Sequence, residues 1–207
     1  MVRMFLAALL AAACASTQAG ASTPAVAVQP NSDSAEELQR LRNLSACLAK
    51  SRPRWARQTL AFGYLSDAQA REAAQALTGT DSCVPNDTEV VFRTSGLVGG
   101  LAEYFLRAEI DRADSARLTE ALATLTPLNV SEDFALCVAV RDPAAARDLA
   151  FSEPGSAVEA RAAAQLARHV PPCIERGEQP TVDLQSLRAL MSTALYRGVT
   201  AVLAGAR

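Results

Sequence analysis

The stretch CLAKSRPRWAR at residues 47–57 recurs in outline as CVAVRDPAAAR at residues 137–147. Each copy begins with a cysteine and continues with a proline and an arginine at the same spacing. In each copy a second cysteine follows 36 residues after the first. A shift of 90 residues aligns the two copies without a gap, and 12 of the 37 positions from cysteine to cysteine are then identical. We interpret this self-similarity as an internal duplication.

Seven of the identities carry more weight than the five alanine matches, because alanine is frequent throughout the chain. These seven are Cys47/Cys137, Pro53/Pro143, Arg57/Arg147, Ser66/Ser156, Arg71/Arg161, Gln75/Gln165 and Cys83/Cys173. The similarity continues past the second cysteine to the pair Arg107/Arg197. The alternative is chance similarity between two helical stretches rich in alanine and arginine. Chance would not readily align both cysteines, the proline and the serine in one frame.

The two copies also share signals for helix starts. From Ser34 onward, leucines recur at helical spacing, which predicts a first helix. Pro53 and Pro143 are each expected to open a second helix, because proline at the first helical position costs no hydrogen bond. Ser66 and Ser156 are each followed three residues later by Gln or Glu, the capping-box pattern that predicts the start of a third helix.

Apolar spacing assigns most of the remaining chain to helices. It predicts an inward face of small residues on the third helix of the first copy, which includes Ala70, Ala73 and Ala74. It also predicts a fourth helix in each copy and a connecting helix at 114–125, whereas 89–92 is the one short β-like run. The Gly-rich run at 96–100 lacks the lysine of a phosphate-binding loop, so we interpret it as a helix-packing surface.

These signals together predict an all-α fold of two tandem, disulfide-closed helical modules packed as a helical repeat or bundle. The first module is expected at residues 34–112. The second module, which includes the connecting helix, is expected at residues 113–207. The competing architecture is a single bundle whose disulfides cross between the two halves.

The N-terminus has the features of a targeting segment. Arg3 precedes an apolar stretch that is too short to span a membrane, and small residues follow it. We expect a signal peptide at 1–21, cleaved after Ala19 or Ala21, and a flexible leader at 22–33. In a competing interpretation, residues 10–14 form a lipoprotein box and Cys14 is the lipid-anchored first residue. No later segment is expected to span a bilayer, because the best candidate, residues 189–206, carries Arg197.

Either cleavage leaves four cysteines in the folded part of the chain. An exported chain with an even number of cysteines is typical of a disulfide framework. Of the three connectivities, the duplication favours one bond in each module, Cys47–Cys83 and Cys137–Cys173. Zinc binding is disfavoured because the chain has no CxxC motif and a single histidine, His169. We therefore expect no metal site.

The composition excludes some common activities. The 207 residues have a formal net charge of −2, and basic and acidic residues are interspersed without a basic stripe, so nucleic-acid binding is not expected. The sequence has no GxSxG, P-loop or GxGxxG motif. His169 is more simply a residue that meets helix carbonyls than a general base. No acidic residue recurs at an aligned position, so we predict no catalytic residue and no cofactor.

The cysteine, proline, arginine, capping serine and second cysteine are followed by a closing helix that ends in Leu106-Arg107 or Leu195-Tyr196-Arg197. This pattern resembles a group of uncharacterised exported proteins from alphaproteobacteria, in which a Cys…Cys helical module ends in a Leu-Tyr-Arg-like tail. The resemblance covers about residues 44–107 and 134–197. It implies export and disulfide bonds and carries no activity. The first copy departs from the tail pattern, because Phe105 precedes its Leu106-Arg107.

The candidate binding residues are arginines kept in both modules and one aromatic residue. Arg57, Arg147, Arg107 and Arg197 could form a pair of equivalent anion sites, or they could brace neighbouring helices through salt bridges and backbone carbonyls. Trp55 occurs only in the first module, and it fits either a binding surface or the core.

The sequence therefore favours an exported, non-catalytic helical repeat protein. We expect it to act in the periplasm or envelope as a binding or scaffold module for an unknown protein partner. One alternative is an enzyme of unrecognised type that uses Glu103 or His169. The other is a structural outer-membrane lipoprotein anchored at Cys14.

Overall fold

The computed structural model describes residues 34–75, 83, 93–174 and 182–205. The expected signal peptide at 1–21, the leader at 22–33, Cys14 and the β-like run at 89–92 lie outside these residues. Within them every regular element is a helix and no strand is present, which confirms the predicted all-α fold.

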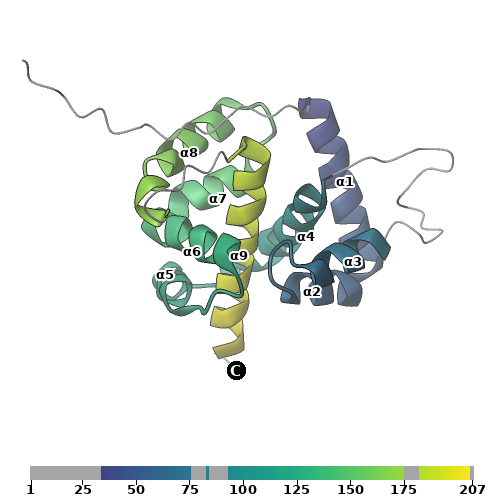
Figure 1. The fold of residues 1–207 in the computed structure, drawn as a ribbon, viewed down its shortest axis with the longest axis horizontal. Coiled ribbons are helices and arrows are strands. Elements are labelled where there is room, and N and C mark those ends of the chain that lie inside the picture. The colour runs from purple at the N-terminus through teal and green to yellow at the C-terminus, as the bar shows by residue number, and fades with distance from the viewer. Residues whose placement is uncertain (1–33, 76–82, 84–92, 175–181, 206–207) are drawn as a thin grey trace, which may run out of the picture.

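Four helices come from the first half of the chain and five from the second (Figure 1). The first set is α1 (Ala35–Ser51), α2 (Pro53–Ala61), α3 (Asp67–Gln75) and α4 (Thr94–Glu109), which a 3-10 turn, η1 (Ile110–Arg112), follows. The second set is α5 (Ser115–Thr124), α6 (Val130–Arg141), α7 (Pro143–Phe151), α8 (Ala157–Ala167) and α9 (Leu184–Gly205), with a second 3-10 turn, η2 (Pro171–Cys173), before α9. Helices α2 and α7 begin and end 90 residues apart, and α4 and α9 begin 90 residues apart.

The helix starts follow from local chemistry. Prolines occupy the first positions of α2 and α7. Ser66 Oγ accepts a hydrogen bond from the Gln69 N–H at 3.2 Å, and Ser156 Oγ accepts one from the Glu159 N–H at the same distance. The structure differs from the predicted capping box in one respect. The side chains of Gln69 and Glu159 accept a hydrogen bond from the backbone N–H of the residue before the serine. The N···O distances are 2.7 Å for Leu65 and 2.6 Å for the glycine before Ser156.

Helix α9 is the centre of the molecule. It runs between α5–α8 on one side and α1–α4 on the other, and it contacts α4, α5, α6 and α7 (Figure 1). The fully buried side chains at this centre come from both halves of the chain. They include Leu101, Leu106, Leu187, Met191 and Leu195. One continuous hydrophobic core therefore spans the two expected modules, since the α4–α9 interface joins them.

Glycines allow α4 to approach its neighbours closely. A Cβ atom on Gly99 would lie 2.6 Å from both Cα and Cβ of Ala189 in α9, and one on Gly100 would collide with the Ser45 side chain in α1. These distances are shorter than atomic contact permits, so both positions require glycine at this helix spacing. The interpretation of the Gly-rich run at 96–100 as a packing surface is confirmed.

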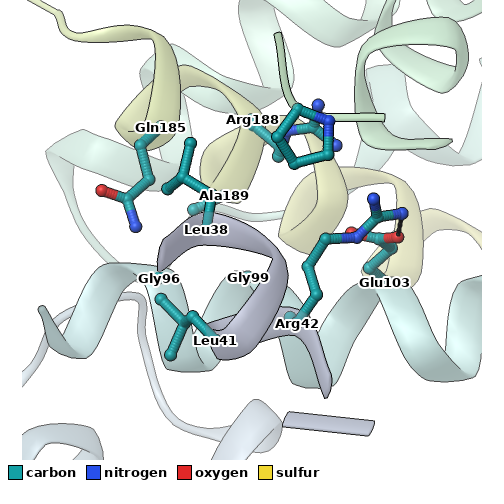
Figure 2. A pocket seen from close by; sticks show the side chains of 11 residues that line it. Leu38, Leu41, Arg42, Gly96, Gly99, Glu103, Gln185, Arg188 and Ala189 are labelled. Atoms are coloured by element: carbon teal, nitrogen blue, oxygen red, sulfur yellow. Dashed lines mark hydrogen bonds and ion pairs between the residues drawn. The ribbon is translucent and has the colours of Figure 1, made fainter. Parts of the chain in front are cut away.

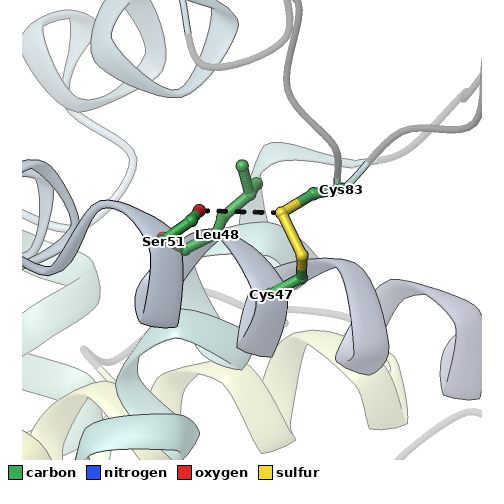
Figure 3. Close-up of a disulfide and its surroundings, with 4 residues drawn as sticks. All are labelled: Cys47, Leu48, Ser51 and Cys83. Carbon is green, nitrogen blue, oxygen red and sulfur yellow. Dashed lines mark hydrogen bonds between the residues drawn. A yellow bond between two sulfur atoms is a disulfide. The ribbon is translucent and has the colours of Figure 1, made fainter.

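The disulfides link Cys47 to Cys83 and Cys137 to Cys173, which confirms the pairing that the duplication favours. One bond joins α1 to the segment after α3 (Figure 3), the other joins α6 to the segment after α8, and the Cα atoms lie 5.7 Å apart in both. Neither bond crosses between the halves, so the competing crossed arrangement is wrong.

Among the described residues, no helix is both long enough and apolar enough to span a membrane, and this includes α9. This finding agrees with the expectation drawn from Arg197.

Candidate functional site

A groove of about 590 Å³ lies beside the second disulfide. The segment before α6, the first turn of α6, the segment around η2 and the start of α9 form its walls. Most of its lining is apolar, and the apolar side chains are Leu128, Val130, Phe134, Ile174, Val182 and Leu190. A hollow of this size is typical of clefts that take up a ligand or a few partner side chains. We therefore treat this groove as the candidate functional site.

Two apolar side chains at the groove project into solvent. Leu128 is 56% exposed and Val130 is 79% exposed. Asp133, which is also exposed, is the charged residue among the described lining residues. Exposed apolar side chains beside a hollow mark surfaces that bind other molecules more often than isolated ones do. The groove thus presents an apolar surface with one negative charge.

The wall of the groove is fixed by a buried carboxylate. Glu132, 3% exposed, accepts hydrogen bonds at 2.8 Å from the backbone N–H groups of both Leu128 and Tyr64. Asn129 caps α6 by accepting from the Glu132 N–H at 3.0 Å, and its side-chain amide donates to the Tyr64 carbonyl at 2.8 Å. These bonds join the segment before α6 to the turn after α2. The exposed side chains of Leu128 and Val130 therefore stand on a well-anchored backbone.

Arg197, a candidate binding residue, supports this wall from behind. Its guanidinium forms an ion pair with Glu132 and donates to the Thr126 carbonyl at 3.1 Å. The Arg197 side chain is 17% exposed. In this position it braces helices, as in the second of the two interpretations that the sequence left open.

The other three candidate arginines surround the C-terminal end of α4. Arg57 donates to Glu109 at 2.8 Å and lies over the Phe105 ring, 4.1 Å from its centroid. Burial alone would lower the pKa of the Arg57 guanidinium, but the Glu109 carboxylate raises it above its ordinary value. Arg57 therefore stays a cation with its charge matched by a carboxylate.

Arg107 and Arg147 meet at one aromatic ring. Their guanidinium carbons lie 4.6 and 5.8 Å from the centroid of Phe151. Arg107 also donates to Glu103 and to the Phe151 carbonyl, while Arg147 forms an ion pair with Asp111 at 2.9 Å. The structure thus brings these two candidates together, and it places Arg57 and Arg197 in separate ion pairs.

Trp55 packs against the core while remaining partly exposed. Tyr64, another aromatic residue specific to the first half, is 3% exposed. Burial, with a smaller contribution from Asp183, raises the pKa of the Tyr64 phenol above its ordinary value. Neither aromatic residue lines the groove.

Glu103, one candidate for an enzyme site, is held in an ion pair. It accepts from Arg42 and Arg107, and its side chain is only 6% exposed. Figure 2 shows Arg42 and Glu103 turned toward each other at the edge of a hollow of about 30 Å³ between α1, α4 and α9. Glu103 therefore joins α1 and α4 through its ion pairs with Arg42 and Arg107.

His169, the other enzyme candidate, lies in the segment after α8. Its Nε2 is 4.0 Å from a carboxylate oxygen of Asp142, and this carboxylate also caps α7 by accepting from the Ala145 N–H at 2.9 Å. Groups of three or more His, Cys, Asp or Glu placed to hold a metal ion do not occur among the described residues. The predictions of no catalytic residue, cofactor or metal remain predictions.

A third buried ion pair was not foreseen from the sequence. Glu159 (α8) pairs with Arg188 (α9) at 2.6 Å, with side chains 3% and 11% exposed, and Arg188 also donates to the Ser152 carbonyl at 2.8 Å. In the first half the equivalent of Glu159 is Gln69, whose amide donates to the carbonyls of Thr59 and Phe62. The neutral amide thus takes the place of the ion pair.

Comparison with known proteins gives no further guidance: no family model, no curated protein and no solved structure matches the chain. The class of protein is therefore set by the fold and the site. It is an all-α, disulfide-bonded helical protein with an apolar groove beside one disulfide.

Proposed function

We propose that this protein is an exported, non-catalytic helical module of the cell envelope that binds a protein partner through the groove. The observation that carries the proposal is the apolar groove of about 590 Å³ with Leu128 and Val130 exposed at its edge. The two disulfides support export, because such bonds persist in oxidising compartments. The targeting features of residues 1–21 support the same location and favour the periplasm.

We further infer that the two halves arose by duplication. The support is the set of 12 identities in 37 aligned positions, together with helices α2 and α7 that share both bounds at an offset of 90 residues. The groove wall has no equivalent in the first half, since residues 125–129, which precede α6, align with residues 35–39, which belong to α1. Binding would then be a property of the second half.

The occupant that fits the groove is an apolar peptide segment carrying a basic residue. Apolar side chains of such a segment would cover Leu128, Val130 and Phe134, and its cation would lie near Asp133. Burial of this surface supplies most of the binding free energy, at about 25 cal/mol per Å². The single charge orients the segment more than it strengthens binding.

A labelled synthetic peptide of leucine, valine and lysine tests the groove directly by fluorescence anisotropy. Leu128→Ser and Asp133→Lys should each weaken binding, whereas Val158→Ser should not, because Val158 is 41% exposed on α8 but does not line the groove. Equal binding by all variants would contradict the proposal.

A photoreactive residue in place of Val130 tests the partner in intact cells, with one in place of Val158 as the matched control. The expected result is a crosslink to a different protein from position 130 that is absent from position 158. A crosslinked species of twice the mass of the chain would show a second copy in the groove and would refute the proposed partner. The lipoprotein alternative is tested separately by mass spectrometry of the mature N-terminus for a lipid on Cys14.

A further inference from the structure

The two disulfides close loops of equal length but have different neighbours. Both span 36 residues, so the loop-closure entropy is the same and the local surroundings must decide any difference between them. In the first half the hydroxyl of Ser51 lies 3.6 Å from Cys83 Sγ (Figure 3). The equivalent position in the second half is Arg141.

Arg141 places a positive charge at a disulfide sulfur. Its Nη1 donates to Cys137 Sγ at 3.0 Å and to the Cys137 carbonyl at 3.1 Å, which fixes the guanidinium over the bond. The neighbouring acidic residue, Asp142, is engaged by the Ala145 N–H and faces His169. A thiolate formed at Cys137 would therefore have a cation beside it from the moment of its formation.

The other cysteine of this bond, Cys173, borders the groove. It is only partly buried. An attacking thiolate can thus approach Cys173 from the groove, while the leaving sulfur, Cys137, is the one beside Arg141. Both conditions for fast exchange, access to one sulfur and a stabilised leaving thiolate, are met at the same bond.

We propose that Cys137–Cys173 is a thiol-exchange site and that Cys47–Cys83 is a structural disulfide. A thiolate of a dithiol reductant attacks Cys173 Sγ and forms a mixed disulfide, and the Cys137–Cys173 bond breaks with its electron pair on Cys137. The second thiol of the reductant, after loss of its proton, attacks the reductant's own sulfur in the mixed disulfide and releases Cys173 as a thiolate. The reductant is oxidised to a disulfide, and two electrons reduce Cys137 and Cys173. This activity goes beyond partner binding and does not depend on it.

The test uses the oxidised full mature chain and glutathione as the probe. The protein is exposed to an excess of reduced glutathione at pH 7, free thiols are trapped with N-ethylmaleimide at successive times, and each cysteine is quantified by peptide mass spectrometry. Cys137–Cys173 should open faster than Cys47–Cys83, and the glutathione adduct should form on Cys173. Equal rates for the two bonds, or an adduct mainly on Cys137, would overturn the proposal.

Matched variants measure how much the positive charge of Arg141 accelerates opening of Cys137–Cys173. Arg141→Ser reproduces the first half and should slow opening of Cys137–Cys173 by about two- to fivefold, the range expected for an exposed charge contact. Arg141→Lys should restore most of the rate, and Ser51→Arg should accelerate opening of Cys47–Cys83. In Arg141→Ser the rate at Cys47–Cys83 is the internal control and should not change. An unchanged rate at Cys137–Cys173 in Arg141→Ser, with circular dichroism as in the native chain, would refute the role of the cation.

Discussion

Replacing Arg188 with methionine should destabilise the protein strongly, because it leaves a buried carboxylate without its cation. Glu159 and Arg188 are 3% and 11% exposed, and Arg188 also serves the carbonyls of Ala150 and Ser152. Loss of one partner of such a pair costs about 3–5 kcal/mol. At about 2–4 °C per kcal/mol for a chain of this size, the expected fall in Tm is about 10 °C.

The first half of the chain has uncharged residues at the two positions that correspond to Glu159 and Arg188. Gln69 corresponds to Glu159, and its amide forms hydrogen bonds with backbone groups of the turn after α2. Val98, which is fully buried, corresponds to Arg188. The double variant Glu159→Gln/Arg188→Met should therefore recover most of the lost stability. Urea unfolding of the two single variants and the double variant gives the coupling free energy, which should reach about 2–3 kcal/mol.

An exposed ion pair provides the control for this cycle. Arg40 and Glu36 are 70% and 75% exposed, so Arg40→Met should change stability by less than about 1 kcal/mol. The reasoning fails if the effects of the Glu159 and Arg188 substitutions simply add, to within about 0.5 kcal/mol. It also fails if Arg188→Met is no more harmful than Arg40→Met.

Three further outcomes follow from the packing, the disulfides and one buried phenol. Gly99→Ala should lower the free energy of unfolding by about 1–3 kcal/mol in urea titrations, because the new Cβ meets the backbone of Ala189; native-like stability would contradict the close approach of α4 and α9. Complete reduction of both disulfides should lower Tm by well over 10 °C, since each bond contributes about 3–4 kcal/mol, and an unchanged Tm after verified reduction would show that the apolar faces suffice. The raised pKa of Tyr64 favours its protonated form in the folded state, so its contribution is complete below pH of about 10, the ordinary pKa of tyrosine, and is lost above it. Tyr64→Phe should therefore reduce the loss of stability measured between pH 9 and 11, and an unaltered alkaline profile would assign that loss to other groups.

The sequence predicts most of the helices because their starts depend on neighbouring residues. Pro53 and Pro143 open α2 and α7 as expected, and Ser66 and Ser156 bond to the first turns of α3 and α8. Each of these signals acts within three or four residues, so a single sequence contains all the information that is needed. The cysteine pairing was predictable for another reason, since the duplication selected one connectivity of three.

The buried face of α3 was predicted only in part. Ala73 is buried as expected, but Ala74 is exposed and Ala70 only partly buried, and fully buried Gln69 takes a place in the core. Hydrophobicity alone does not predict this choice. Gln69 is buried because the turn after α2 offers a backbone N–H and two carbonyls that satisfy its amide, and these partners exist only in the folded turn.

The groove could not be predicted, because it is formed by segments far apart in the chain. Asn129 followed by Glu132 is a capping signal that can be found in the sequence. That Glu132 is buried depends on Tyr64 and Arg197, which are 68 and 65 residues away. Arg197 was selected because both halves keep it, but its role as a brace for the groove wall appears only with the tertiary contacts.

The central position of α9 determines the order in which the chain can fold. Helices α4 to α7 all contact α9, so the core surface that they share with residues 184–205 stays uncovered until that segment has been synthesised. Until then α4 to α7 lack their largest contact surface, and short helices are marginally stable alone. We therefore expect the core to be completed only when α9 packs, although the sequence consists of two similar halves.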